Sequence, residues 1–314
     1  MSGTDVLIGV LAAIALFIYA LQGFSEEIEQ KGGERLRRLL ENTTASPLRG
    51  YLLGAGITAL LQSSSAVGAL TVALIDAGTL TLRGSLPVFL GTNVGTTATA
   101  FLISFDLGSL GSWLIVAGAA GSLVGGRWGL VGKAVFYCGL VLFSLHLLSD
   151  ALKPIKNHAI VAIILSYASS PILGILIGAI VTAVVQSSSV TIGLTVLLAQ
   201  QSIVPTSAIL PIVIGANLGT TSTALIASYS LSQTARNAAL ANFFFNAVAG
   251  VALFPFLWLI SEPAGKMVDD PGVAVALCHI GFNLLVSALG FQLMERVIAA
   301  LPKQPAREQS HQTV

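Results

Sequence analysis

The chain has 314 residues, of which 54% are hydrophobic and only 9% are charged, and its formal net charge is +1. Soluble domains carry about a quarter of charged residues, so this composition excludes an ordinary soluble protein. The balanced charge gives no reason to expect a nucleic-acid partner. Several apolar runs exceed the roughly 20 residues that cross a hydrocarbon core, and the alternating pattern of a membrane β-barrel is missing. The sequence therefore predicts an all-α polytopic protein of the lipid bilayer.

The predicted elements are runs of low polarity bounded by charges. Membrane crossings are expected at residues 5–24, 85–105, 110–126, 131–150, 207–228, 236–260 and 273–294. The charged residues 26–41 suit an interfacial amphipathic helix with a solvated face and no chemical role, and the tail 303–314 is expected to be disordered. No positively charged segment precedes the first crossing, which is interpreted as a retained helix rather than a signal peptide. Cys138 and Cys278 fall inside predicted helices and are expected to pack there, with no disulfide.

Two further apolar segments, 48–76 and 172–200, contain the same polar motif, Gln-Ser-Ser-Ser (QSSS), at residues 62–65 and 186–189. At this offset of 124, residues 46–104 align without a gap on residues 170–228, and 26 of the 59 pairs are identical. Such agreement indicates an internal duplication. A turn at QSSS would leave backbone groups unpaired in lipid if the segment crossed the membrane, so each segment is expected to be a re-entrant helical hairpin.

The positions of the basic residues test this topology. With the N-terminus outside and both hairpins re-entrant, twelve of the 15 basic residues lie inside, and only Lys153, Lys156 and Lys266 lie outside. A full crossing at either hairpin would place later basic loops on the wrong side. The sequence therefore predicts a multi-pass protein of the cell inner (plasma) membrane with its N-terminus outside and its C-terminus in the cytoplasm.

The duplication also extends to the first crossing, because LFIYALQGFSEEI from Leu16 aligns with LVLFSLHLLSDAL from Leu140. Three crossings separate corresponding points, so the second copy should be inverted relative to the first. The predicted organisation is a first inverted repeat at 5–126, a second at 131–260 and a final transmembrane helix at 273–294. Each repeat should hold a hairpin and a broken transmembrane helix, and inversion would place the two QSSS turns near the midplane, facing one another.

Each QSSS motif offers an amide side chain, three hydroxyls and backbone groups freed where the helix breaks. The helix that resumes after the serines points its N-terminal amides and positive dipole end into the break, which suits an anion such as a phosphate oxygen. The alternative is that these residues only form hydrogen bonds between packed helices. Two copies in register favour a binding role.

Each hairpin is followed by a proline, Pro87 or Pro211, and then by Gly-x-Asn-x-Gly-Thr-Thr-x-Thr. The Asn and Thr oxygens of this motif are neutral ligands of the kind that a small alkali cation accepts. The alternative is a close helix contact through glycines four residues apart, and the two roles are compatible.

Neither motif contains a charged residue, so an anion bound by dipoles and hydroxyls alone would face a large desolvation cost. Cations bound beside the anion would offset this cost, and their gradient would drive transport. Coupling would then follow from mutual electrostatic stabilisation, which is reciprocal between the two sites.

The motifs LLQSSSAVGAL and VVQSSSVTIGL, followed by GTNVGTT and GANLGTT, resemble the paired signatures of the type II sodium/phosphate cotransporter family, over about residues 5–295. The resemblance implies sodium-coupled import of inorganic phosphate by alternating access, with Na⁺ as coupling ion and sole metal and no other cofactor. The phosphate-binding residues that it implies are Gln62, Ser63, Ser64, Ser65, Gln186, Ser187, Ser188 and Ser189. The expected sodium-binding residues are Gln62, Ser65, Asn93, Thr96, Thr97, Gln186, Ser189, Asn217, Thr220 and Thr221. A homodimer is left open.

Several alternatives remain at this stage. The same site could carry arsenate or sulfate, work as an exporter or belong to a helper subunit of a regulatory complex, while a membrane-embedded hydrolase would need a base that the motifs lack. Asp76 and Asp106 are each either a cation ligand or a loop residue. His146 and His279 are interpreted as interhelical hydrogen-bond partners rather than proton carriers. Asn242 and Asn246 share a helix face and either line the cavity or hold helices together.

Overall fold

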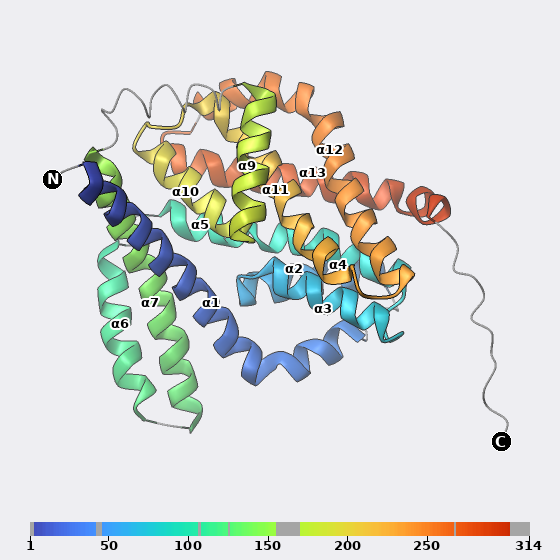
Figure 1. The fold of residues 1–314 in the computed structure, drawn as a ribbon, viewed down its shortest axis with the longest axis horizontal. Helices are drawn as coiled ribbons and strands as arrows, with labels where there is room; N and C mark the ends of the chain where they lie inside the picture. The colour runs from blue at the N-terminus through green and yellow to red at the C-terminus, as the bar shows by residue number, and fades with distance from the viewer. Residues whose placement is uncertain are drawn as a thin grey trace.

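The computed structural model describes residues 3–41, 46–105, 108–124, 126–154, 170–266 and 268–301, and all regular structure in these ranges is helical (Figure 1). The first half comprises α1 (Gly3–Glu41), α2 (Pro47–Leu61), α3 (Ser64–Asp76), α4 (Leu82–Gly95), α5 (Thr97–Ser104), α6 (Gly108–Ser122) and α7 (Gly126–Leu152). The second half comprises α9 (Pro171–Val185), α10 (Ser188–Gln200), α11 (Thr206–Ser228), α12 (Gln233–Lys266) and α13 (Pro271–Ala300).

Six helical segments of the described chain are long and apolar enough to cross a membrane. They are Thr4–Gln30, Leu82–Ser104, Trp128–Leu152, Thr206–Ser228, Gln233–Pro255 and Pro271–Ala300. These coincide with six of the seven predicted crossings and define an all-α polytopic membrane protein. The seventh, 110–126, corresponds to α6, whose 15 residues span about 22 Å at 1.5 Å per residue, short of a hydrocarbon core of about 30 Å. The crossing at 110–126 therefore stays a prediction, because α6 is apolar but shorter than the other six segments.

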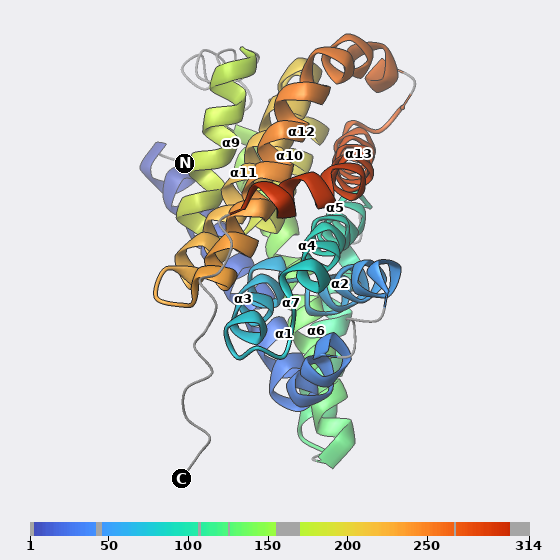
Figure 2. The same ribbon diagram turned by 90° about the vertical axis from the view of Figure 1, so that its right-hand side faces the viewer.

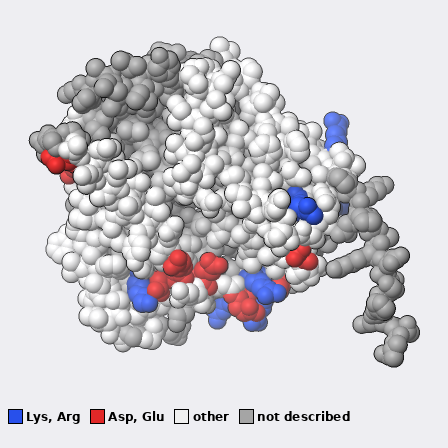
Figure 3. Space-filling model, in the orientation of Figure 1, with Lys and Arg blue, Asp and Glu red and all other residues white. Residues whose placement is uncertain are grey.

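The charged segment 26–41 is the last part of α1 rather than a separate helix. Its buried Leu36 and Leu40 pack in one cluster with Leu61 of α2. Its opposite face carries exposed i,i+4 ion pairs such as Arg37 with Glu41. Figure 3 shows most of the charged side chains in view along the lower edge of the molecule, with a few more at its left and right sides, while most of this face is uncharged. The segment is therefore amphipathic, as predicted.

Glycines allow two pairs of helices to pack at very short distance. A Cβ atom added to Gly91 of α4 would collide with the carbonyl oxygen of Tyr51 on α2, and one added to Gly215 of α11 would collide with that of Ile175 on α9. Gly91 and Gly215 are partners at the offset of 124, and so are Tyr51 and Ile175. The same helix contact is thus built twice, as the glycine spacing indicated.

The helix that follows each hairpin behaves differently in the two copies. In the first copy Thr96 separates α4 from α5 but keeps nearly helical dihedral angles (φ −65°, ψ −22°). In the second copy α11 runs without interruption through Pro211. The prediction of a broken helix in the second repeat is therefore wrong. A buried span keeps its backbone bonds unless other groups replace them, and Thr220 and Thr221 use their hydroxyls on carbonyls of their own helix.

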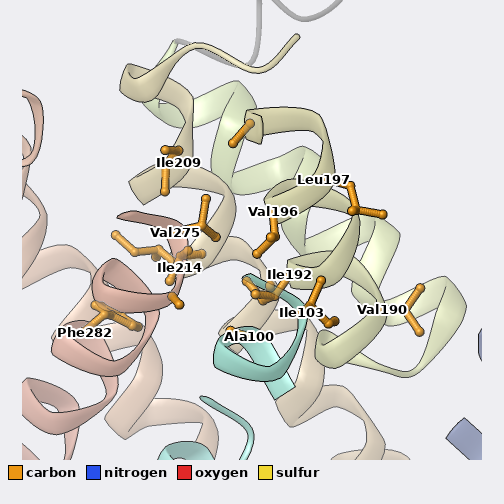
Figure 4. Packing of buried hydrophobic residues seen from close by; sticks show 14 of the residues in the cluster. Ala100, Ile103, Val190, Ile192, Val196, Leu197, Ile209, Ile214, Val275 and Phe282 are labelled. Carbon is orange, nitrogen blue, oxygen red and sulfur yellow. The ribbon is translucent and has the colours of Figure 1, made fainter. Parts of the chain in front are cut away.

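The main hydrophobic core joins the two halves of the chain. In Figure 2, α2, α3 and α4 lie below α9 to α12, with α5 and α13 between them. Figure 4 shows Ala100 and Ile103 of α5 beside Ile192 of α10, and Phe282 of α13 in the same cluster. The short helix α5 is therefore packed among helices of the second half, directly after the threonine-rich motif of the first.

Candidate functional site

Both QSSS motifs interrupt a helix in the same way. Gln62 ends α2 in the left-handed conformation (φ 55°, ψ 23°), and Ser63 begins α3 by accepting a hydrogen bond from the amide three residues on at 3.2 Å. Gln186 ends α9 with φ 56° and ψ 26°, and Ser187 caps α10 at 3.4 Å. A non-glycine residue held at positive φ costs about 1–3 kcal/mol and is found most often at functional sites. Two equivalent glutamines in this conformation make the helix breaks a candidate site.

The two motifs touch each other although 124 residues separate them in sequence. The Ser65 hydroxyl donates a hydrogen bond to the backbone carbonyl oxygen of Gln186 at 2.9 Å. This bond joins the first turn of α3 to the residue that ends α9, two residues before α10 begins. The N-termini of α3 and α10 therefore converge, and each brings unpaired amides and the positive end of a helix dipole to the same place.

Thr99 of α5 links the two motifs a second time. Its hydroxyl donates to Oε1 of Gln62 and lies 3.3 Å from the hydroxyl of Ser189. The side chain is almost fully buried, at 1% exposure. The sequence analysis did not single out this residue, although it is the last threonine of the repeated Gly-x-Asn-x-Gly-Thr-Thr-x-Thr motif. Its repeat partner Thr223 bonds instead to the carbonyl of Thr220, in its own helix, at 2.8 Å.

A cavity of about 530 Å³, here called the serine cavity, opens beside the two helix breaks. All eight residues of the two QSSS motifs line it, and its other wall is formed mainly by one face of α1. The α1 residues in the lining are Ile18, Leu21, Gln22, Ser25 and Glu26. Glu26 was assigned from the sequence to a solvated face without a chemical role, but its side chain belongs to the wall of this cavity.

The charge of the serine cavity is unusual for an anion site. None of its described lining residues is Lys, Arg or His, and its one ionisable group is the carboxyl of Glu26. Helix N-termini and serine hydroxyls can donate hydrogen bonds to an oxyanion, but they supply only partial positive charge. The arrangement can therefore bind an anion and a small cation together more readily than an anion alone.

The six Asn and Thr residues expected to bind sodium lie outside the lining of the serine cavity. Asn93 donates to Oδ1 of Asn246 at 3.1 Å, and Asn217 donates to the carbonyl of Val213 at 3.0 Å. The hydroxyls of Thr96, Thr97, Thr220 and Thr221 each donate to a carbonyl of their own chain segment at 2.6–2.9 Å. Apart from the half-buried Thr220, these residues are buried, as are Asn242 and Asn246, and their hydrogen bonds lie between or within helices.

The remaining polar candidates have local partners or lie elsewhere. Asp76 accepts a hydrogen bond from the amide of Ser232 at 2.7 Å, which ties α3 to the start of α12. His146 lies 3.6 Å from Asp150 on α7. His279 is fully buried, and neither ring nitrogen has a hydrogen-bond partner among the described residues. Asp106 and the tail 303–314 lie outside the described residues.

The fold and the site together define a class of protein, a helical membrane protein whose two halves each place a helix break at one shared cavity. The family model for Na⁺/Pi-cotransporter proteins matches residues 16–150 and again residues 140–256. The chain therefore belongs to the Na⁺/Pi-cotransporter family, and each match covers one copy of the QSSS motif. This is a family of transporters rather than enzymes.

Individual relatives agree with this assignment. The chain is 30% identical over 282 residues to the "Putative inorganic phosphate export protein YjbB" of Escherichia coli, which covers 89% of this chain and 52% of that protein. It is 29% identical over 288 residues to the uncharacterized protein YqeW of Bacillus subtilis, which covers 90% of this chain and 93% of that protein. It is 31% identical over 104 residues to the human sodium-dependent phosphate transport protein 2B, which covers 32% of this chain and 15% of that protein. No solved structure matches the chain.

Proposed function

We propose that the protein is a sodium-coupled transporter that imports inorganic phosphate by alternating access, with phosphate and sodium bound at the two QSSS motifs. The observation that carries this proposal is the convergence of two helix N-termini on a cavity without a basic side chain. Phosphate carries between one and two negative charges near neutral pH. Its charge would meet only dipoles, hydroxyls and the carboxylate of Glu26, so accompanying cations are required for stable binding.

Within the site, we assign phosphate to the resumed helix ends and sodium to the side-chain and carbonyl oxygens beside them. Ser63 and Ser187 accept a capping bond from a backbone amide, which leaves their own O–H groups able to donate to a ligand, whereas the Ser65 hydroxyl already donates to the Gln186 carbonyl. Thr99 connects the side-chain amide of Gln62 to Ser189, and Ser65 bonds separately to the Gln186 carbonyl. A cation bound to these oxygens would draw the two halves of the site together, which is how we expect sodium to favour phosphate binding.

The proposed topology is supported by the contacts between distant segments. Lys133 pairs with Glu27 at 2.8 Å and Arg83 pairs with Glu295 at 2.7 Å, and the sequence-based topology puts both partners of each pair inside. Gln201 donates to the Ser149 carbonyl at 2.8 Å, and this topology puts both of these residues outside. We therefore keep the proposal that the N-terminus faces outward and the C-terminus faces the cytoplasm of the inner (plasma) membrane.

The test is uptake of labelled phosphate by proteoliposomes that contain the purified protein. An inward sodium gradient should drive accumulation, whereas equal gradients of potassium or choline should not. Equal uptake with all three cations would overturn the sodium coupling. Competition by arsenate and sulfate measures selectivity, because dipoles and hydroxyls recognise an oxyanion rather than phosphorus itself.

Export is the second candidate function, because the Escherichia coli relative is named for phosphate export. The same vesicles decide between the two directions when they are loaded with labelled phosphate and the sodium gradient is reversed. A carrier that only exports would release the loaded phosphate in the absence of an inward sodium gradient. The same carrier would fail to accumulate external phosphate when an inward sodium gradient is applied.

A further inference from the structure

A second cavity of about 430 Å³ lies on the other side of the α5–α10 contact from the serines. Its wall is formed by one face of α7, the C-terminal ends of α5 and α10, and the first residues of α13. Several polar groups line it, among them His146, Asp150, Lys153 and Gln200. None of the QSSS residues does.

The walls of the two cavities are related by the internal duplication. Every α1 residue in the lining of the serine cavity has its repeat partner, 124 residues later, in the lining of the second cavity. The partners of Ile18, Leu21, Gln22, Ser25 and Glu26 are Leu142, Leu145, His146, Ser149 and Asp150. The second cavity is thus the counterpart of the serine cavity in the other repeat.

The two cavities point in opposite directions along the α1–α7 pair. Gly9 of α1 faces Ala151 of α7, and Gly23 of α1 faces Tyr137 of α7. The two helices are therefore antiparallel, and a step of 14 residues forward along α1 corresponds to a step of 14 residues back along α7. In this register, residue 18 of α1 lies level with its repeat partner, residue 142 of α7. From that level the linings extend to residue 26 in one direction and to residue 150 in the other. The two ends lie about 24 Å apart, at 1.5 Å per residue, which is most of the thickness of a hydrocarbon core.

Contacts between α5 and α10 separate the second cavity from the serines. Thr99 lies 3.3 Å from Ser189, and one turn further a Cβ atom on Gly193 would come within 2.8 Å of Cδ1 of Ile103. At the cavity itself the Gln200 side chain donates to the Ser104 carbonyl at 3.1 Å. Figure 4 shows Ile103 and Ala100 of α5 packed beside Ile192 of α10.

We propose that the second cavity is the opposite mouth of the same transport path, closed off from the serines by α5 and α10 in this structure. Phosphate and its cation pass through it when these two helices part. The proposal rests on the proposed transport function. Exchange of conformation between two copies of one structural unit would open one mouth as it closes the other. Glu26 and Asp150 place a carboxylate at equivalent positions of the two mouths, and at the second mouth Asp150 forms an ion pair with Lys153 at 2.6 Å.

The first test compares two cysteines at repeat-equivalent positions. In a background with Cys138→Ala and Cys278→Ala, the variants Gln22→Cys and His146→Cys each place one thiol in the wall of one cavity. A membrane-impermeant thiol reagent is applied to either face of sealed vesicles of known orientation. We expect the two thiols to react from opposite faces, and sodium with phosphate to change the two reaction rates in opposite senses. Reaction of both from the same face would overturn the proposal.

The second test closes the α5–α10 contact covalently in the same background. A cysteine at position 193 would collide with Cδ1 of Ile103, and the substitution Ile103→Cys removes this atom. The double variant Ile103→Cys/Gly193→Cys therefore places two thiols side by side, where mild oxidation or mercuric ion can bridge them. We expect bridging to reduce phosphate uptake at least tenfold, to leave phosphate binding in detergent unchanged, and to be reversed by reduction. Uptake at the rate of the two single variants would overturn the proposal. Failure of the proposed function would instead show as no sodium-dependent uptake before bridging.

Discussion

The bond network of Thr99 gives a quantitative prediction for transport. The substitution Thr99→Val keeps the shape of this buried side chain but removes the hydroxyl that donates to Gln62 and lies beside Ser189. A lost hydrogen bond costs about 0.5–1.5 kcal/mol, and a partly buried acceptor left without its donor costs about 1–3 kcal/mol. Because the serine cavity lets water reach part of the site, we expect a total of about 1–2 kcal/mol. This corresponds to a roughly 5- to 30-fold loss of apparent affinity.

The repeat supplies a matched control for this prediction. Thr223→Val removes the equivalent hydroxyl, whose bond among the described residues is to the Thr220 carbonyl of the same helix, so we expect less than about a twofold change in apparent affinity. Thr99→Ser keeps the hydroxyl and should recover most of the affinity. The assay is sodium-driven phosphate uptake into proteoliposomes over a range of phosphate and sodium concentrations, with thermal unfolding as a check on stability. Equal effects of Thr99→Val and Thr223→Val would refute the assignment of Thr99 to the site.

Three further predictions concern the helix break and the packing around it. Gln62→Gly keeps the left-handed turn but removes the amide, so uptake should fall at least tenfold with little change in melting temperature; normal uptake would contradict the site assignment. Gly91→Ala should lower the free energy of unfolding by about 1–3 kcal/mol, because its Cβ atom would collide with the backbone of α2. Gly56→Ala has open space around its Cβ atom and should leave the free energy of unfolding unchanged; a denaturation assay of both variants measures the difference. Thr58→Val should leave the free energy of unfolding equal or higher, because the buried Thr58 hydroxyl has no hydrogen-bond partner among the described residues. Thr182→Val should lower the free energy of unfolding by about 1 kcal/mol, because it removes the 2.7 Å bond to Thr191 of α10; the opposite order would show that the Thr58 hydroxyl has a function.

The helix breaks were predictable because the signal is local. A glutamine followed by three serines offers an N-cap, and the next turn regains the apolar pattern, so the helix restarts at Ser64 and Ser188. The hairpin segments, expected at 48–76 and 172–200, coincide with α2–α3 and α9–α10 within a residue or two. The identical offset of all repeated elements supplied a second, independent constraint.

The details that depend on contacts between distant segments were less predictable. The threonines of the GTNVGTT motif were assigned to cations from their chemistry. In the structure, the hydroxyls of Thr96 and Thr97 donate to carbonyls of α4, and it is Thr99 that reaches the site. Side-chain direction changes by about 100° from one helical residue to the next. Which threonine faces a partner therefore depends on how α5 packs against α10.

By itself the sequence determined that the chain is a helical membrane protein, that it is duplicated, and where the two serine-rich helix breaks fall. These properties follow from hydrophobicity, periodicity and capping, which act within a few residues. Only the tertiary structure decided that Ser65 reaches Gln186, that Thr99 bridges the motifs, and that Glu26 shares their cavity. Such contacts depend on how helices that lie 37 to 121 residues apart in the sequence dock against one another, and close packing allows only one arrangement of them.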